Sequence, residues 1–571
     1  MQSSSWKLGA WKLWAAAVVS AGLLELPFPL AGPLPIWRTV FAWFGLVPLL
    51  WAILSPACAE SPRPLRRAFL LSYLSGILWY AGNCYWVRDV MLHYGDMPPM
   101  APTLLLLGYS MVLGLYFGLF GLGVALVCRA TGSTRLALAV APVFWAALEL
   151  AASRITSVPW DQLGYSQVDN ALVNQLAPWT GVYGISFLLV AVNALLAGGL
   201  LLDCCPQKFF GDGRLWGLAG TVLLLGGMAG LLLAPPRPAA TATAVLVQPN
   251  LDVSGVGAWT GPGEWDRHIA EFTRLAEENC KTGAPNDRSS SLGWKSYIAG
   301  IPQTGAPQGE IACPPYPTHP DLVVWPESPA PFAEEDTRFQ QALARIARQT
   351  EAPLVVGSLG TDYSAEKDSW RFYNSARIEA ADGKPVGRYD KIHLVPFGEY
   401  IPFQDLLFFA HKLTGRVSSF TRGTERKVFR LNGHRYGVFI CYESVFADEV
   451  REFPELGAEV LVNISDDGWY GDTSASWQHL NMARMRAIEN RRWLLRDTNN
   501  GITAVIDPYG RVRQSIPRHQ TDALPAGYGF RDDVTFYTAH GDVFGWLCVL
   551  MSCVVVAWSG RKLLRKWVSA S

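Results

Sequence analysis

The chain has 571 residues, of which 50% are apolar and only 17% are charged, and tryptophan alone occupies 23 positions. This composition is typical of a protein with much of its surface in lipid, and the length predicts at least two domains. The formal net charge is zero, so composition offers no Lys/Arg excess of the kind that nucleic-acid binding requires.

Apolar stretches fill the chain up to about residue 235. At a rise of about 1.5 Å per residue, each is long enough to cross a hydrocarbon core of about 30 Å. Seven lie there and an eighth stands alone near the C-terminus, at residues 8–26, 36–54, 68–87, 103–128, 134–152, 172–202, 215–234 and 543–559. We therefore predict a polytopic α-helical membrane bundle of about eight spans. Glu25 and Glu149 lie in or at the ends of spans, and the sequence leaves their role open.

Basic residues gather in alternate loops between these stretches. They are Lys7, Lys12, Arg63, Arg66, Arg67, Arg129, Arg135, Lys208, Arg214 and the segment 561–566. Short loops rich in Lys and Arg stay in the cytoplasm, so both termini are expected there and residues from about 238 to 540 on the outer face. The first stretch is alternatively a cleaved signal peptide with a small-residue site at 19–21, and the later loops keep the same sidedness either way.

From residue 241 the pattern changes to alternating strands and helices, which is typical of an α/β domain. Strands are expected in "TATAVLVQPN", "DLVVWPES", "PLVVGSLG", "VFICYES", "EVLVNISDD" and "ITAVIDPYG", and helices over 264–280, 337–351 and 476–491. The predicted domains are a bundle over 1–237, an outer α/β domain over 238–540, and an eighth span with a basic cytoplasmic tail over 541–571.

Residues 281–320 interrupt this pattern. They are rich in Pro, Gly and Ser, and we interpret them as a surface insertion in the outer domain. Cys280 and Cys313 flank the segment, and an oxidising outer compartment would permit a disulfide between them. The sequence leaves open whether that disulfide forms.

Three polar residues follow apolar or constrained stretches of the outer domain. Glu327 ends "DLVVWPES", Lys391 lies in "RYDKIHLVPFGEYIP", and Cys441 ends "GVFICYES". The carboxyl ends of strands in α/β sheets converge on one edge, so these side chains are expected to meet. A free thiol has a pKa of about 8.5, so a nucleophilic cysteine needs a carboxylate to take its proton or a cation to stabilise the anion.

These residue types suggest roles. Glu327 can act as the base, while Lys391 can hold the thiolate and then an oxyanion, helped by the backbone N–H of Tyr442. Glu399, eight residues after Lys391, can fix the position of the lysine and keep it charged. Each signal is weak alone. A cysteine at a strand end is commonly a buried structural residue, and an Asp–Lys pair commonly lies on a solvent-exposed surface.

Metal chemistry has no support in the sequence. The ten cysteines and nine histidines form no CxxC pair and no HExxH motif, so neither a metal site nor a cofactor is predicted. The adjacent pair Cys204 and Cys205 lies between apolar stretches and is expected to be inert.

The ordered motifs "WPES", "YDKIHLVPFGEYIP", "CYES" and "SDDGWYG" resemble the carbon–nitrogen hydrolase (nitrilase) superfamily with its Glu-Lys-Cys triad. The longer segments "KIHLVPFGEYIP", "HLNMARMRAIENRR" and "TNNGITAVIDPYG", together with the apolar stretches, are similar to the membrane branch of that superfamily, the bacterial apolipoprotein N-acyltransferases. This resemblance covers nearly the whole chain and implies a nitrilase-like αββα sandwich for the outer domain.

The resemblance also implies an activity. A cysteine takes an acyl chain from a membrane phospholipid as a thioester and passes it, in a ping-pong reaction, to the α-amine of diacylglyceryl-cysteine on an apolipoprotein. It implies a monomeric enzyme in the bacterial inner membrane, without a cofactor. By the motifs, Glu327 is the general base, Lys391 the oxyanion stabiliser and Cys441 the nucleophile.

Other matched positions are expected to support the reaction. Glu399 and Glu443 match supporting acids near the pocket, with Tyr442 between the nucleophile and Glu443, and Trp469 and Tyr470 match a loop at the entrance. The sequence departs from the family at the insertion 281–320 and at Trp259, a candidate pocket tryptophan that lacks the neighbouring lysine we expect. Residues 403–413 carry Phe403, Leu406, Leu407, Phe408 and Phe409, and they are either an arm in the membrane interface or a packed helix.

Two rival functions fit parts of the sequence. A membrane-tethered amidase or nitrilase would use the same triad with water as the acceptor. A transporter or scaffold with an inactive nitrilase-like domain would not need the intact Glu327, Lys391 and Cys441. Seven spans before the domain favour a lipid substrate over a soluble one.

Overall fold

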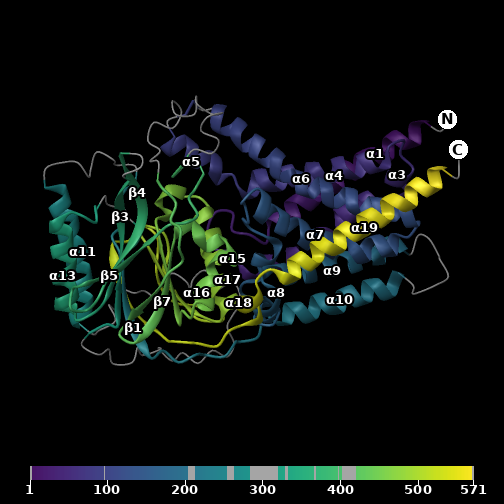
Figure 1. Ribbon diagram of the computed structural model, residues 1–571. Helices are drawn as coiled ribbons and strands as arrows, with labels where there is room; N and C mark the ends of the chain where they lie inside the picture. Colours follow the sequence, from purple (N-terminus) through teal and green to yellow (C-terminus); the bar gives the residue numbers. More distant parts are fainter. Residues whose placement is uncertain are drawn as a thin grey trace. The chain divides into compact units, whose positions relative to one another are not determined.

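The computed structural model describes residues 3–95, 97–98, 100–202, 213–253, 263–282, 319–327, 332–364, 368–396, 398–400 and 420–568. The chain forms two compact units (Figure 1). The first comprises Met1–Arg88, Pro98–Ala234 and His540–Ser571, and the second comprises Asp89–Met97 and Pro235–Ala539. The two units therefore divide close to the change in hydropathy along the chain.

The first unit is helical. Its longer elements are α1 (Ser3–Glu25), α2 (Val47–Leu54), α4 (Pro64–Asn83), α6 (Met100–Thr131), α7 (Thr134–Ile155), α9 (Val182–Leu202), α10 (Gly213–Ala229) and α19 (Val543–Val568). Within the described residues, five segments are long and apolar enough to cross a membrane: Ile36–Leu54, Met100–Thr131, Thr134–Ile155, Val182–Leu202 and Val543–Lys566. The protein is therefore a polytopic membrane protein by length and composition.

The predicted count of about eight spans is not confirmed. The helix α10 has only 17 residues, and α4 begins beside Arg66 and Arg67 and buries the polar Ser72 and Ser75. The stretch predicted to span from residue 172 becomes a long helix only at Val182. Short turns precede it and end at Gly181, whose positive φ of 62° stops the preceding helical turn.

Helices from both ends of the chain pack together in the first unit. Cys548 on α19 lies in an apolar cluster with Val143, Ala146 and Ala147 on α7. Arg154 at the end of α7 forms an ion pair of 2.5 Å with the buried Asp542, just before α19 begins. The C-terminal helix is thus part of the bundle, although it is more than 300 residues distant from the rest in sequence.

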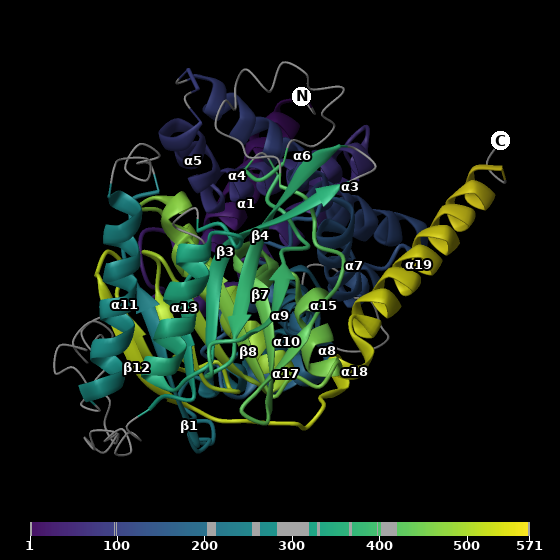
Figure 2. The same cartoon turned by 60° about the vertical axis from the view of Figure 1, so that its left-hand side comes forward.

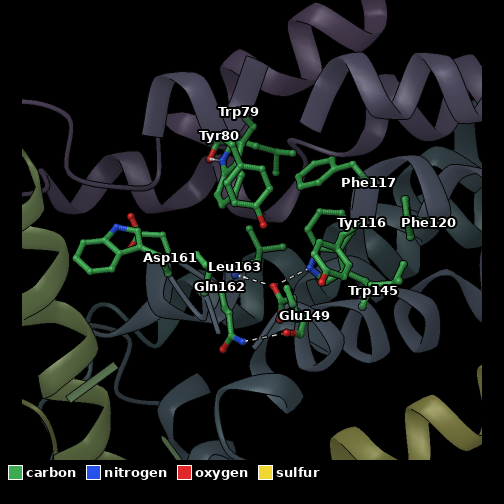
Figure 3. Close-up of a pocket in the computed structure, with 15 residues that line it drawn as sticks. Trp79, Tyr80, Tyr116, Phe117, Phe120, Trp145, Glu149, Asp161, Gln162 and Leu163 are labelled. Carbon is green, nitrogen blue, oxygen red and sulfur yellow. Dashed lines mark hydrogen bonds between the residues drawn. The ribbon is translucent and has the colours of Figure 1, made fainter. Parts of the chain in front are cut away.

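A pocket in the first unit contains Glu149, whose role the sequence left open (Figure 3). Its Oε1 accepts hydrogen bonds of 2.8 Å from both the indole Nε1 of Trp145 and the backbone N–H of Leu163. Asp161, on the same lining, accepts from the amide of Asn83 at 3.0 Å. These contacts tie α7 and α4 to the connection that follows α7, so both acids have a structural use in holding the bundle together.

The second unit contains two six-stranded sheets. Their strand orders are β12-β1-β2-β3-β4-β5 and β11-β10-β9-β8-β7-β6. The strands of the first sheet are β1 (Ala242–Gln248), β2 (Leu322–Val324), β3 (Leu354–Ser364), β4 (Ser369–Glu379), β5 (Pro385–Asp390) and β12 (Asp522–Tyr528). Those of the second are β6 (Val428–Leu431), β7 (His434–Ile440), β8 (Val460–Ser465), β9 (Trp493–Thr498), β10 (Thr503–Ile506) and β11 (Val512–Ile516).

Helices cover the outer faces of the two sheets. On the first sheet, α11 (Glu264–Thr282) and α13 (Thr337–Thr350) bury Phe272, Phe339 and Leu343 against the strands (Figure 2). On the second, α17 (Ala475–Asn490) is almost wholly buried. The hydroxyl groups of Tyr436 on β7 and Tyr528 on β12 lie 2.7 Å apart and join the sheets to each other. The order is helix, sheet, sheet, helix, as the family resemblance implies for this domain.

Candidate active site

Polar residues follow the carboxyl ends of strands in both sheets. Within the first sheet β2 and β3 are parallel, while β4 is antiparallel to β3 and to β5. The strands β2 and β5 therefore end on the same edge, where Glu327 follows the first and Lys391 the second. In the second sheet β7 and β8 are parallel, and Cys441 and Asp466 follow them directly. This alternation of strand directions brings residues more than 100 positions apart to one place.

Lys391 is the centre of this cluster. Its side chain is almost completely buried, and its Nζ donates to Oε1 of Glu327 at 3.0 Å and to Oε1 of Glu399 at 2.8 Å. Burial alone would lower the pKa of the lysine, but the charges of Glu327 and Glu399, and then that of Cys441, raise it well above its ordinary value. The amine is therefore held as an ammonium ion between two carboxylates, as the spacing of Glu399 suggested.

The carboxylates of Glu327 and Glu399 accept further hydrogen bonds besides those from Lys391. The side-chain amide of Asn374, on β4, donates to Oε1 of Glu327 at 2.6 Å and to Oε1 of Glu399 at 2.7 Å. The other oxygens accept backbone N–H groups, Glu327 from Asp466 at 2.8 Å and Glu399 from Val395 at 2.7 Å. All of these partners donate, which suits ionised carboxylates and leaves Glu327 able to accept a proton.

Cys441 begins the helical turn η4 (Cys441–Val445) with a φ of 50°, in the left-handed region that side chains other than glycine rarely adopt. Its thiol is buried and lies within hydrogen-bonding reach of the Ser465 hydroxyl. Burial and then the charge of Glu327 raise the pKa of the thiol well above its usual value, and Lys391 opposes them. A raised pKa favours the neutral thiol at rest, so the sulfur needs a base to take its proton, the role that the sequence suggested for Glu327.

Glu443 connects the cysteine turn to the lysine loop. Its carboxylate accepts the backbone N–H groups of Ile440 and Ile392, each at 2.7 Å, and that of His393 at 3.2 Å. It also accepts the hydroxyl of Tyr389 at 2.9 Å. The sequence placed Glu443 near the pocket as a supporting acid. The structure shows a buried anchor whose hydrogen bonds go to the backbone, so it contributes by holding two segments in register.

Aromatic residues flank this cluster. Trp469 is 47% exposed and packs edge-to-face on Tyr94 at 5.3 Å, while Tyr470 follows it, and burial and then the charge of Cys441 raise the pKa of its phenol. Tyr442 is nearly buried and packs against Phe446. Four other predictions lie outside the residues whose side chains are described: Trp259, the arm at 403–413, most of the insertion 281–320, and the disulfide between Cys280 and Cys313.

Two features of the site were not foreseen. Asn374 lies on a strand, β4, that the sequence analysis did not identify, and its only signal is a polar residue at an inward position of "RFYNSARIEA". His479 is in a motif that was recognised, but no role was assigned to it.

Across the parts of the chain that the structure covers, no group of three or more His, Cys, Asp or Glu residues is arranged to hold a metal ion.

Both units match known protein families. Residues 20–195 match the family model described as "Apolipoprotein N-acyltransferase N-terminal domain", and residues 309–524 match "Carbon-nitrogen hydrolase". An apolipoprotein N-acyltransferase of Geobacter metallireducens is 32% identical, over 96% of this chain and 95% of that one. This chain belongs to the apolipoprotein N-acyltransferase family.

Two further proteins are similar to this chain. The apolipoprotein N-acyltransferase of Pseudomonas aeruginosa is 31% identical over 78% of this chain and 79% of that one. A solved structure of a Nesterenkonia amidase from the nitrilase superfamily is 16% identical over 55% of this chain and 98% of that chain, with a TM-score of 0.36. The protein is thus an N-acyltransferase of the nitrilase superfamily that acts in lipoprotein N-acylation in a bacterial membrane.

The raised pKa of the Cys441 thiol predicts how its reactivity depends on pH. The rate of alkylation by iodoacetamide should rise about tenfold per pH unit from about pH 7 to about pH 9 without levelling, because the thiolate fraction keeps growing below the pKa. The rate is measured by mass spectrometry of the peptide that contains Cys441, with the exposed Cys553 as internal comparison. A plateau below about pH 8 would contradict the protonated resting state.

The anchoring role of Glu443 predicts a cost when its charge is removed. In Glu443→Gln the side-chain NH₂ faces backbone donors, so the second unit should lose about 2 kcal/mol of stability. Calorimetric unfolding of the purified protein in detergent measures this change, and Glu425→Gln, at a side chain that is 73% exposed, is the matched control. Equal unfolding temperatures for the two variants would show that Glu443 is not an anchor.

Proposed function

We propose that this protein takes an acyl chain from a membrane phospholipid as a thioester on Cys441 and passes it to the α-amine of diacylglyceryl-cysteine at the N-terminus of a lipoprotein. The observation that carries the proposal is the buried ammonium of Lys391, bonded to Glu327 and electrostatically coupled to the thiol of Cys441. A general base, a cation and a nucleophile are the groups that acyl transfer through a thiol requires.

In the first half-reaction Glu327 takes the proton of the Cys441 thiol as the sulfur attacks the ester carbonyl of the phospholipid. The ammonium of Lys391 and the backbone N–H of Tyr442 stabilise the oxyanion that forms. The tetrahedral intermediate then expels the lysophospholipid alkoxide, which recovers the proton from Glu327. The products of this half-reaction are a lysophospholipid with a free hydroxyl and an acyl thioester on the enzyme.

In the second half-reaction the neutral α-amine of the lipoprotein attacks the thioester. Glu327 takes a proton from the nitrogen, and the oxyanion again forms beside Lys391. Collapse of the intermediate breaks the carbon–sulfur bond and returns the proton to the cysteine. Glu399 keeps Lys391 in place throughout, because it accepts the second hydrogen bond of the ammonium.

Membrane-spanning helices suit an enzyme with lipid substrates. Each CH₂ of an acyl chain gains roughly 0.8 kcal/mol by staying in an apolar environment, so both lipid substrates remain in the bilayer. The described residues include five helices that are long and apolar enough to cross a membrane, and they belong to the same chain as the catalytic unit, which supports a lipid substrate. The distribution of basic loops supports an outer, periplasmic position for the catalytic unit, with both termini in the cytoplasm.

Intact mass tests the thioester. The purified full-length protein is incubated in detergent with phosphatidylethanolamine and no acceptor, and one acyl adduct that hydroxylamine removes should appear. Cys441→Ala should show none, whereas Cys553→Ala, at an exposed cysteine on α19, should acylate normally. An adduct that survives in Cys441→Ala, or no adduct in the unaltered protein, would overturn the mechanism.

The fate of the adduct separates the two enzyme functions that the sequence left open. Addition of a diacylated lipopeptide should discharge the adduct and give an N-acylated peptide in equal amount. Release of free fatty acid at the same rate with and without the lipopeptide would instead identify a membrane-tethered hydrolase.

A further inference from the structure

A buried polar cluster lies directly behind the nucleophile. It consists of His479 on α17, Asp467 on the turn η5 (Asp467–Tyr470) and Arg496 on β9, and all three side chains are fully buried. The Nη2 of Arg496 donates to both oxygens of Asp467, at 2.9 and 2.8 Å, and lies 3.0 Å from Nδ1 of His479. Such a cluster has a high cost of burial, so its geometry is strongly determined.

The other ring nitrogen of His479 faces the cysteine turn. Its Nε2 lies 2.7 Å from Oγ of Ser444 and 3.2 Å from the carbonyl oxygen of Cys441. Together with Nδ1 at 3.0 Å from Asp467, this is the atom order of a Ser-His-Asp triad. Ser444 is completely buried, however, so its hydroxyl cannot meet a substrate and the cluster is not a second nucleophilic site.

The contacts of the ring decide where its hydrogen lies. A carbonyl oxygen only accepts and a guanidinium only donates. The tautomer with the hydrogen on Nε2 satisfies both, since it donates to Cys441 and accepts from Arg496. The opposite tautomer would donate from Nδ1 to Asp467 and accept from the Ser444 hydroxyl at Nε2, but it would set a lone pair against the Cys441 carbonyl and an N–H against the guanidinium. We assign the hydrogen to Nε2, and the variants below test that assignment. Burial, and then the charge of Arg496, lower the pKa of His479, so the ring is neutral at pH 7.

The hydrogen bond to the Cys441 carbonyl acts on the peptide unit that also carries the N–H of Tyr442. That carbonyl belongs to the same trans peptide as the N–H of Tyr442, and the two groups point in opposite directions. Fixing the carbonyl therefore fixes the direction of the N–H. It also restrains ψ of Cys441, the residue whose left-handed φ of 50° costs about 1 kcal/mol without support.

We propose that His479 is a positioning residue. Through its Nε2–H bond to the Cys441 carbonyl it holds the left-handed turn of the nucleophile and aims the Tyr442 N–H at the oxyanion. Arg496 sets the tautomer that makes this bond, and Asp467 holds Arg496 in place. The role at the oxyanion rests on the proposed function, whereas the role in shaping the cysteine turn does not.

Two amide substitutions separate this role from simple packing. In His479→Gln the amide nitrogen reaches the place of Nε2 and can still donate to the carbonyl, whereas in His479→Asn it reaches only the place of Nδ1. The turnover number kcat for acyl transfer should fall by about 100-fold in His479→Asn and recover to within about threefold of the unaltered protein in His479→Gln. The KM for phospholipid should change little in either, because the bond is made to the backbone of the cysteine turn and His479 is fully buried.

A second readout needs no acyl donor. Alkylation of Cys441 by iodoacetamide should change by about tenfold in His479→Asn and not in His479→Gln, since only the former releases the cysteine turn. If the unaltered protein forms no acyl adduct but this difference is found, the proposed function fails and the positioning role stands. If the adduct forms and the two variants are alkylated alike, the positioning role fails alone.

Folding is followed by calorimetry on the same full-length samples. A merely structural histidine would lower the unfolding temperature in both variants, with kcat lost in proportion to the unfolded fraction. A folded His479→Gln protein with a kcat reduced about 100-fold would overturn the proposal even if His479→Asn does not fold. Ser444→Ala, which removes the other neighbour of Nε2, should keep kcat within about threefold, and a loss as large as that of His479→Asn would assign the role to the hydroxyl instead.

Discussion

The buried ammonium of Lys391 is the constraint on which the catalytic unit depends. An ion loses several kcal/mol of hydration when it is buried, and this loss is offset only when partners surround it with good geometry. Here the Oε1 atoms of two carboxylates accept its hydrogen bonds together with those of the Asn374 amide, and two backbone N–H groups donate to the Oε2 atoms. The lysine therefore forces segments from both sheets to meet, and the nucleophile is placed by that meeting.

The sequence predicted those residues whose signal is local. Glu327, Lys391 and Cys441 each follow an apolar or constrained stretch, and strand ends in α/β sheets meet at one edge, so their convergence could be foreseen. Asn374 could not, because it lies inside an 11-residue strand paired over its whole length with β3, and the pairing is not visible in a single sequence. The role of Glu443 was equally hidden, because three of its partners, the backbone N–H groups of Ile392 and His393 and the hydroxyl of Tyr389, are about 50 residues away in sequence.

The membrane unit shows the opposite pattern. Hydropathy located the long helices α6, α7, α9 and α19 well, because lipid demands continuous apolar side chains. Its count of about eight spans is not confirmed, since five segments among the described residues are long and apolar enough to cross a membrane. In α4, Ser72 and Ser75 are fully buried, and a helix covered by neighbours needs no uniformly apolar surface. Glu149 was conspicuous in the sequence, but only its partners Trp145 and Leu163 explain it, and Asp161, which the sequence analysis did not single out, is explained by Asn83.

One side chain, Glu443, binds the turn of the nucleophile and the loop of the lysine at the same time. The thiol and the cation that serves it are consequently not independent parts that can drift singly. A sequence change that removes this carboxylate therefore takes a hydrogen-bond acceptor from both segments at once. Glu443 thus links the geometry of the nucleophile to that of the cation, so a substitution at this one buried position is felt in two segments that are about 50 residues apart in sequence.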